Sequence, residues 1–199
     1  MTTKTKRILL VNGHPGDESL SRQLLKNYGS AAIESGHAVR HTDISRMVFD
    51  ADFGQSSYHD SKPLEPDLET FLADLKWSQH VVLAAPIWWG GVPAKLKGLL
   101  DRALLPGRSF DPRQTNCVGA PRPLFAGRSA RLILTSDTAR WALRAFYGDA
   151  IIKQIRRQVF EFIGLRPMRL TYFAPANQAS EATVNGWFKN MRRLGSKGS

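Results

Sequence analysis

Short apolar runs alternate with stretches of helical periodicity along nearly the whole chain, and few folds accommodate such an alternation. The apolar runs lie at residues 7–12, 38–44, 81–86, 130–135 and 169–173. Apolar residues at helical spacing predict helices at about residues 20–36, 66–77, 94–104, 144–163 and 181–194. Several of the predicted strands are almost wholly apolar, so both of their faces must be covered. The pattern therefore predicts an α/β fold with a parallel sheet between two layers of helices.

The length of the chain fits one domain with its own hydrophobic core. It has 199 residues, of which 42% are hydrophobic and 23% charged, as is ordinary for a globular protein. We therefore expect a single domain over residues 1–199. The one cysteine, Cys117, excludes an internal disulfide and a paired-cysteine redox site, and it indicates a reducing, cytoplasmic setting. Neither a signal peptide nor a membrane-spanning run is evident, so we expect no stable membrane insertion.

Three loops are expected to form a ligand site. In open parallel sheets, ligands bind at the carboxyl ends of the strands, near the point where the strand order reverses. This rule selects residues 12–21, 86–93 and 135–147. Two further segments, residues 45–62 and 106–127, interrupt the pattern and are expected to be long loops.

The first of these loops has the composition of an anion site. It places His14, Ser19 and Ser21 where the start of a helix presents unpaired backbone N–H groups. An imidazole and two hydroxyls can complete the shell around a phosphate. The loop matches neither the GxGxxG nor the GxxxxGK[ST] pattern, which argues against a Rossmann dinucleotide site and a P-loop. An ordinary capped turn stays open as the alternative.

The other two loops provide flat apolar surfaces. Trp88 and Trp89 follow a strand directly, and adjacent side chains in an extended segment point in opposite directions, so one ring can form an aromatic wall. The glycines that follow let a planar ligand approach the backbone. Residues 135–141 add hydroxyls and Trp141, and Tyr147 lies beyond them. Together the three loops suit a phosphorylated planar cofactor, and a flavin fits that description.

Motifs along these loops also follow the order found in a known family. They are His14-Pro15 with Ser19-Leu20-Ser21, then Pro86-Ile87-Trp88-Trp89-Gly90 with residues 93–98 and Asp101-Arg102, and then Gly107 and Phe110. In these residues the chain resembles the flavodoxin-like NAD(P)H:quinone oxidoreductase family, and the likeness covers nearly its whole length. The resemblance implies a flavodoxin-like three-layer sandwich with a five-stranded parallel sheet in the order 2-1-3-4-5. It also implies a homodimer with flavin sites at the subunit interface.

The resemblance implies a role for each matching residue. The phosphate or pyrophosphate region of the flavin would be held by His14, Ser19, Leu20 and Ser21. One edge of the isoalloxazine ring would be lined by Pro86, Ile87, Trp88, Trp89 and Gly90, and the opposite side by Thr135, Ser136, Asp137 and Thr138 with Trp141 nearby. Tyr147 would be the catalytic residue over the ring, and the substrate would be bound by Trp89, Phe110 and Tyr147.

The chain departs from the family pattern at two places. It has Thr135-Ser136-Asp137-Thr138 where many members carry Thr-Thr-Gly-Gly, which puts the close backbone approach that glycines permit in doubt. If Tyr147 stands for a histidine, a group with an ordinary pKa of about 10 replaces one of about 6.5, which changes the proton chemistry at the site.

The leading functional hypothesis is a flavoenzyme, with FMN or FAD, that transfers a hydride from NAD(P)H to a quinone or similar acceptor by a ping-pong mechanism. A flavodoxin-type electron carrier and a regulatory flavoprotein subunit of a transporter are the alternatives. The formal net charge of +11 argues against a carrier of the usual acidic kind. The choice between FMN and FAD, the choice between NADH and NADPH, and the acceptor are left open.

Other charged and metal-binding residue types suggest no further function. No nucleic-acid-binding module accompanies the positive charge, so we expect no nucleic-acid partner. Lys95, Lys97 and Arg102 are expected on a solvated helix face. We expect no metal site, because the candidate histidines have no ligand spacing; they are His37, His41, His59 and His80.

Overall fold

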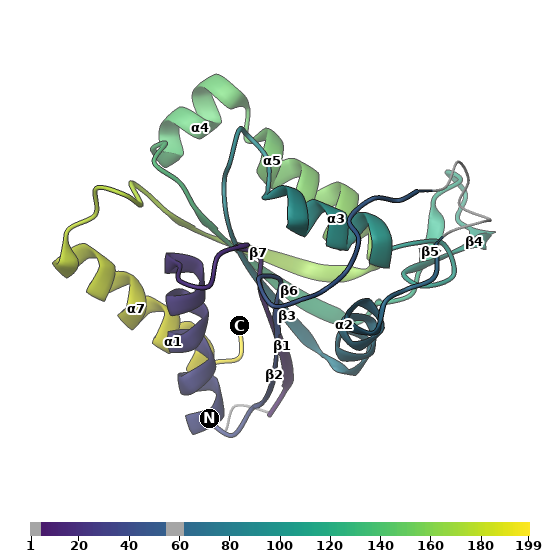
Figure 1. Ribbon diagram of the computed structural model, residues 1–199, viewed down its shortest axis with the longest axis horizontal. Coiled ribbons are helices and arrows are strands. Elements are labelled where there is room, and N and C mark those ends of the chain that lie inside the picture. Colours follow the sequence, from purple (N-terminus) through teal and green to yellow (C-terminus); the bar gives the residue numbers. More distant parts are fainter. Residues whose placement is uncertain (1–4, 55–61) are drawn as a thin grey trace.

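A five-stranded parallel sheet forms the centre of the computed structural model, which describes residues 5–54 and 62–199 (Figure 1). Across the sheet, the strands are β2 (Ala38–Asp43), β1 (Arg7–Asn12), β3 (His80–Pro86), β6 (Arg128–Thr135) and β7 (Leu165–Phe173). All neighbouring pairs are parallel. Every residue of β3 is buried, as an apolar central strand with both faces covered requires. Because the order reverses between β1 and β3, the loops after these strands open into one crevice.

Helices cover both faces of the sheet and bury alternate residues of each strand. On one face, α1 (Leu20–Glu34) and α7 (Glu181–Ser196) lie side by side; on the other lie α2 (Pro66–Trp77) and α3 (Ala94–Ala103), together with the helical segments that precede β7 (Figure 1). Ile8 and Leu10 of β1 pack in the core beneath α1 and α7. Leu9 and Val11 of β1 point to the other face and pack in the core beneath α2 and α3. This alternation is the period of two that a strand imposes on its side chains.

A short β-hairpin lies between β3 and β6 in the sequence, where the sequence predicted only a long loop. β4 (Phe110–Thr115) and β5 (Pro121–Pro123) pair antiparallel in a sheet of their own. Counted without them, the five strands of the main sheet stand in the expected order 2-1-3-4-5. The hairpin sequence has several prolines and arginines and no alternation of apolar and polar residues, so the usual strand signal is absent.

The predicted helix over residues 144–163 was wrong in its start and in its continuity. The chain forms instead α4 (Arg140–Tyr147), α5 (Ala150–Lys153), the π-helical η1 (Gln154–Phe160) and α6 (Glu161–Ile163). Gly148 and Asp149 are both left-handed, with φ of 58° and 59°, and they break the helix. The Asp149 carboxylate is paired with the guanidinium of Arg140, with 2.8 Å between Nη2 and Oδ2, which joins the break to the start of α4.

Arg102 is buried, so its expected place on a solvated helix face was wrong. It holds the long segment between β2 and α2 against α3, since its Nη2 donates to the backbone oxygen of Pro63 at 2.8 Å and to Glu65 Oε2 at 2.9 Å. Its Nη1 donates to the backbone oxygen of Asp50. Residues 55–61 of that segment, including His59, lie outside the described residues. Among the described helices, none is both long and apolar enough to cross a bilayer.

Candidate functional site

Ten of the predicted residues line one cavity at the carboxyl ends of β1, β3 and β6. The cavity has a volume of about 320 Å³. Its lining comprises His14, Ser19, Leu20, Ser21, Pro86, Ile87, Trp88, Thr135, Ser136, Asp137, Ala176 and Asn177. All three loops that the strand-end rule selected therefore contribute to it.

The turn between β1 and α1 brings the backbone close to β3. Gly13 N donates to the backbone oxygen of Ala84 at 2.7 Å. A Cβ at Gly13 would lie 2.6 Å from the side chain of Leu96 and 3.1 Å from that same oxygen, so a larger residue would force the buried Leu96 side chain to shift. His14 then turns its ring toward the second loop, where it meets Trp88 edge to face with 5.4 Å between the ring centroids. The turn thus joins two walls of the cavity.

The start of α1 offers the cavity one hydroxyl that has no partner. Ser19 is the N-cap, and its Oγ accepts a hydrogen bond from Arg22 N at 3.2 Å. Ser21 is only 1% exposed, and its Oγ has no hydrogen-bond partner among the described residues. A buried hydroxyl is costly without a partner. A phosphate or another anion at this helix N-terminus would satisfy both Ser21 and the free N–H groups of the first turn.

The second loop separates the two tryptophans, but neither ring packs into the core, since Trp88 is 44% exposed and Trp89 fully exposed. Trp88 lines the cavity and closes a tight turn, because its N–H and carbonyl each bond the backbone of Gly91 at 2.9 Å. Trp89 has a φ of 51° and is fully exposed, so its ring points away from the cavity. Gly90 follows with a φ of 75°. Neither Trp89 nor Gly90 lines the cavity.

The third wall joins the loop after β6 to the loop after β7. Asp137 accepts hydrogen bonds from Asn177 N at 2.7 Å and from Asn177 Nδ2 at 2.6 Å. Thr138 does not line the cavity, but its N–H donates to Ser136 Oγ at 3.1 Å. The sequence analysis missed Ala176 and Asn177. The strand-end rule would have found them had it been extended to the loop after the last strand.

Three further predicted residues, besides Trp89, Gly90 and Thr138, lie outside the cavity in a single chain. Trp141 and Tyr147 project from α4 and are 68% and 64% exposed. Phe146, on the same short helix, is also exposed and contacts Trp141 with 6.0 Å between ring centroids. Phe110 begins β4 and packs against Phe162, with 5.0 Å between ring centroids. The predicted catalytic and substrate-binding tyrosine therefore stands on an exposed aromatic surface, away from the cavity.

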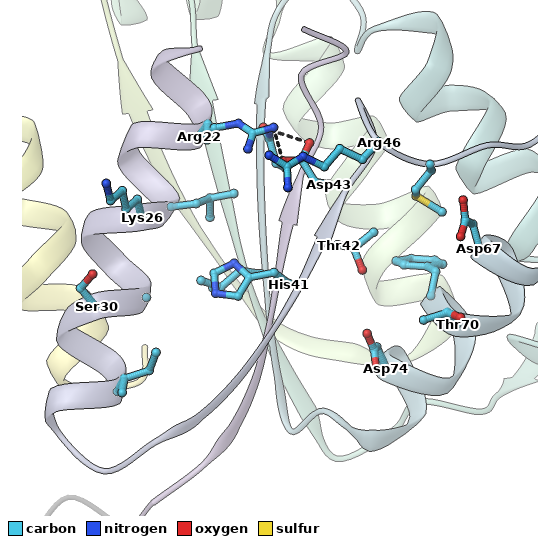
Figure 2. Close-up of a pocket in the computed structure, with 17 residues that line it drawn as sticks. Arg22, Lys26, Ser30, His41, Thr42, Asp43, Arg46, Asp67, Thr70 and Asp74 are labelled. Carbon is cyan, nitrogen blue, oxygen red and sulfur yellow. Dashed lines mark hydrogen bonds and ion pairs between the residues drawn. The ribbon is translucent and has the colours of Figure 1, made fainter. Parts of the chain in front are cut away.

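A larger groove of about 690 Å³ runs along β2, between α1 and α2, and none of the predicted residues lines it. Arg22, Asp43 and Arg46 lie at its upper end in Figure 2, and Asp74 lies at its lower end. Two of its carboxylates are already paired, Asp43 with Arg22 at 2.5 Å and Asp74 with Arg40 at 2.8 Å. The smaller cavity is the better candidate for the ligand site. Its unpaired hydroxyl and helix N-terminus suit a phosphate, and its aromatic wall suits a planar ring.

Among the histidines that the structure describes, His14 alone lines the cavity. Burial and the neighbouring cations Lys6 and Arg131 lower the pKa of His80 to about 3, and its Nδ1 lies 2.8 Å from Ser129 Oγ. Within residues 5–54 and 62–199, no three side chains of His, Cys, Asp or Glu are grouped so as to hold a metal ion.

Comparison with known proteins identifies the family. The chain is 27% identical over 111 residues to an uncharacterized NAD(P)H oxidoreductase of Escherichia coli, a match that covers 54% of this chain and 57% of that protein. It is 25% identical over 192 residues to an FMN-dependent NADH:quinone oxidoreductase of Shewanella amazonensis, covering 92% and 93%. The solved NAD(P)H:quinone oxidoreductase of Methanothermobacter marburgensis has the same fold, with a TM-score of 0.79 and 18% identity over 97% of this chain and 96% of that one. Residues 6–193 match the family described as having a flavodoxin-like fold, and the chain belongs to that family.

Proposed function

We propose that this protein is a flavin-dependent NAD(P)H oxidoreductase that passes a hydride equivalent from NAD(P)H to a quinone or a similar acceptor. The observation that carries the proposal is the meeting of three strand-end loops around one cavity with a helix N-terminus and an aromatic wall. The relatives support it, since the Shewanella protein that matches over nearly its whole length is named for FMN and quinone.

The cavity residues fit a flavin phosphate. The buried Ser21 hydroxyl lacks a partner, and the first N–H groups of α1 carry the positive end of the helix dipole. Ser19 and Leu20 would present these groups, with His14 closing the turn beside Trp88. FMN is the flavin that the Shewanella relative is named for, and we propose it over FAD.

The remaining walls would position the flat ring system. Pro86, Ile87 and Trp88 supply one wall and residues 135–137 the other. When bound, the flavin would supply the two-electron chemistry that lets NAD(P)H and the acceptor react in turn, in a ping-pong order. The chain's own part is to hold the ring between these walls, to exclude water beside Trp88, and to offer loop N–H donors where negative charge develops.

The exposed rings on α4 support a homodimer. Trp141, Phe146 and Tyr147 are all exposed, and Trp89 is fully so. A monomer rarely leaves so much aromatic surface uncovered, and two-fold dimers are the commonest assemblies. In a dimer, the partner copy would cover this surface, and the Tyr147 hydroxyl would donate a hydrogen bond or proton to the acceptor. Phe110 and Trp89 would complete the apolar walls of the acceptor site.

Turnover by the purified chain tests this function. We expect NADH or NADPH to be oxidised in the presence of menadione with no other protein added. Flavin binding without such turnover, together with electron transfer only after a separate reductase is added, would identify an electron carrier instead. Absence of both flavin binding and turnover would refute the proposal. Co-purification with a membrane partner would favour a regulatory subunit, while a soluble active dimer fits the cytoplasmic enzyme that we propose.

A further inference from the structure

One carboxylate, Asp43, holds both ends of the turn that joins β1 to α1. Asp43 is the last residue of β2 and stands opposite Asn12, the last residue of β1. Its Oδ1 accepts a hydrogen bond from Asn12 Nδ2 at 3.1 Å, and its Oδ2 pairs with Arg22 Nη2 at 2.5 Å. Because Arg22 belongs to the first turn of α1, residues 13–19 are fixed at both ends by the same side chain. Figure 2 shows Arg22 and Asp43 facing each other at the upper end of the groove.

At the first end, Asp43 determines the orientation of a buried amide. Asn12 is only 4% exposed, and its Oδ1 accepts a hydrogen bond from His14 N at 3.2 Å. An amide nitrogen donates and an amide oxygen accepts, so the Asp43 contact fixes which atom faces His14. Without Asp43, the buried Nδ2 would lose its acceptor, and a flipped amide would leave His14 N without one. The hydrogen bonds from Asp43 through Asn12 to His14 thus lead to the cavity wall, because the His14 ring packs on Trp88.

At the other end, Asp43 pairs with a cation that lies outside the cavity, and Asp17 Oδ1 lies 3.8 Å from the same Arg22 Nη2. Arg22 N donates to the N-cap oxygen Ser19 Oγ, but the Arg22 guanidinium lines the groove along β2 and not the cavity. Ser45 helps to hold it there, since Ser45 Oγ accepts from Arg22 Nη2 at 3.1 Å and donates to Asp43 Oδ1 at 2.9 Å. The groups that face the anion site from the start of α1 are therefore backbone N–H groups and the Ser21 hydroxyl.

We propose that Asp43 is a positioning residue for the flavin phosphate, acting through Asn12 and Arg22 without touching the flavin. The proposal rests on the proposed function. Loss of Asp43 would let the turn relax at both ends, so the donors of the first turn of α1 would no longer converge on one point. The effect should fall mainly on the phosphate, because neither Asn12 nor Arg22 belongs to the walls formed by residues 86–88 and 135–137, and the turn meets those walls only where the His14 ring packs on Trp88.

Binding of FMN and of riboflavin, which lacks the phosphate, separates positioning from general destabilisation. The flavin-free chain is titrated with each compound, and quenching of flavin fluorescence gives both affinities. Asp43→Ala should lower FMN affinity at least about tenfold, the loss expected when one displaced donor no longer reaches the charged phosphate, and should lower riboflavin affinity much less. Asp43→Asn keeps an oxygen acceptor for Asn12 but loses the charge, so its FMN loss should be smaller. Asp74→Ala is the matched control, because Asp74 lies in the same groove, pairs with Arg40 and does not touch the turn.

The outcomes distinguish a positioning role for Asp43 from a general loss of stability. An unchanged FMN affinity in Asp43→Ala, or equal losses for FMN and riboflavin, would overturn the positioning role. If Asp43→Ala does not fold, Asn12→Ala removes the other half of the first contact and must show the same loss, larger for FMN than for riboflavin. A wild-type chain that binds neither compound would refute the proposed function itself. A wild-type chain that binds FMN no better than the variants do would overturn only the role of Asp43.

Discussion

Removing the Ser21 hydroxyl should stabilise the flavin-free protein and weaken flavin binding at the same time. Ser21 is 1% exposed and its Oγ has no partner, and a buried hydroxyl left unpaired costs about 1–3 kcal/mol. Because the cavity beside it is open to water, we take the low end: Ser21→Ala should raise the free energy of unfolding by about 1 kcal/mol, or the Tm by about 2–4 °C. FMN affinity should fall about tenfold, since one hydrogen bond to a charged group is lost. Thermal unfolding of the flavin-free chain and FMN titration measure the two effects.

A second buried serine provides the control. Ser78 is also 1% exposed, but its Oγ donates to the backbone oxygen of Leu75 at 2.9 Å. Ser78→Ala should therefore lower the free energy of unfolding by about 1 kcal/mol and leave FMN affinity unchanged. If Ser21→Ala instead destabilised the protein as Ser78→Ala does, or bound FMN as tightly as the wild type, then the Ser21 hydroxyl would not be reserved for an anion.

Three further substitutions probe other parts of the molecule. Arg102→Met should lower the free energy of unfolding in urea by about 3 kcal/mol, because it removes the cation that pairs with Glu65 and leaves the backbone carbonyls of Asp50 and Pro63 without that donor. A loss below about 1 kcal/mol would contradict this. The pKa of His80 is lowered from 6.5 to about 3, so in that range the unfolded chain binds its proton and the folded chain does not. The free energy of unfolding should thus fall as the pH drops from 6.5 toward 3. In the His80→Gln variant this fall should be less steep, by up to about 1.4 kcal/mol per pH unit. Identical pH curves for the wild type and the variant would count against this reasoning. Trp89→Ala should change the free energy of unfolding by less than about 0.5 kcal/mol, since the ring is fully exposed, while raising the KM for menadione; a large loss of stability would mean that the ring is packed.

The sheet was predictable because its buried strands are short apolar runs that can be recognised in the sequence. The run of residues 80–86 is apolar after His80 and buried throughout, and a wholly apolar strand is compatible only with a sheet covered on both faces. The break in the helix after Tyr147 could not be read in the same way. Asp149 adopts a left-handed conformation, which aspartate tolerates better than most residues but does not require, and its bond to Arg140 is visible only in three dimensions.

The candidate site was predictable where it depends on chain topology and not where it depends on side-chain direction. The strand-end rule brought His14, Ser21 and Trp88 to one cavity. It could not tell that Trp89 would point away, because that follows from a positive φ at a single residue. The buried place of Arg102 was equally hidden, since its partners come from a segment with no periodic pattern.

Analysis of the cofactor bound to the purified chain tests the flavin site most directly. Heat-released material should show flavin absorbance and the mass of FMN, at about one molecule for each chain, and adding FMN to flavin-free protein should restore it. The Ser21→Ala chain should retain less FMN under the same purification. A wild-type chain that carries no flavin and takes up none from excess FMN would contradict the account.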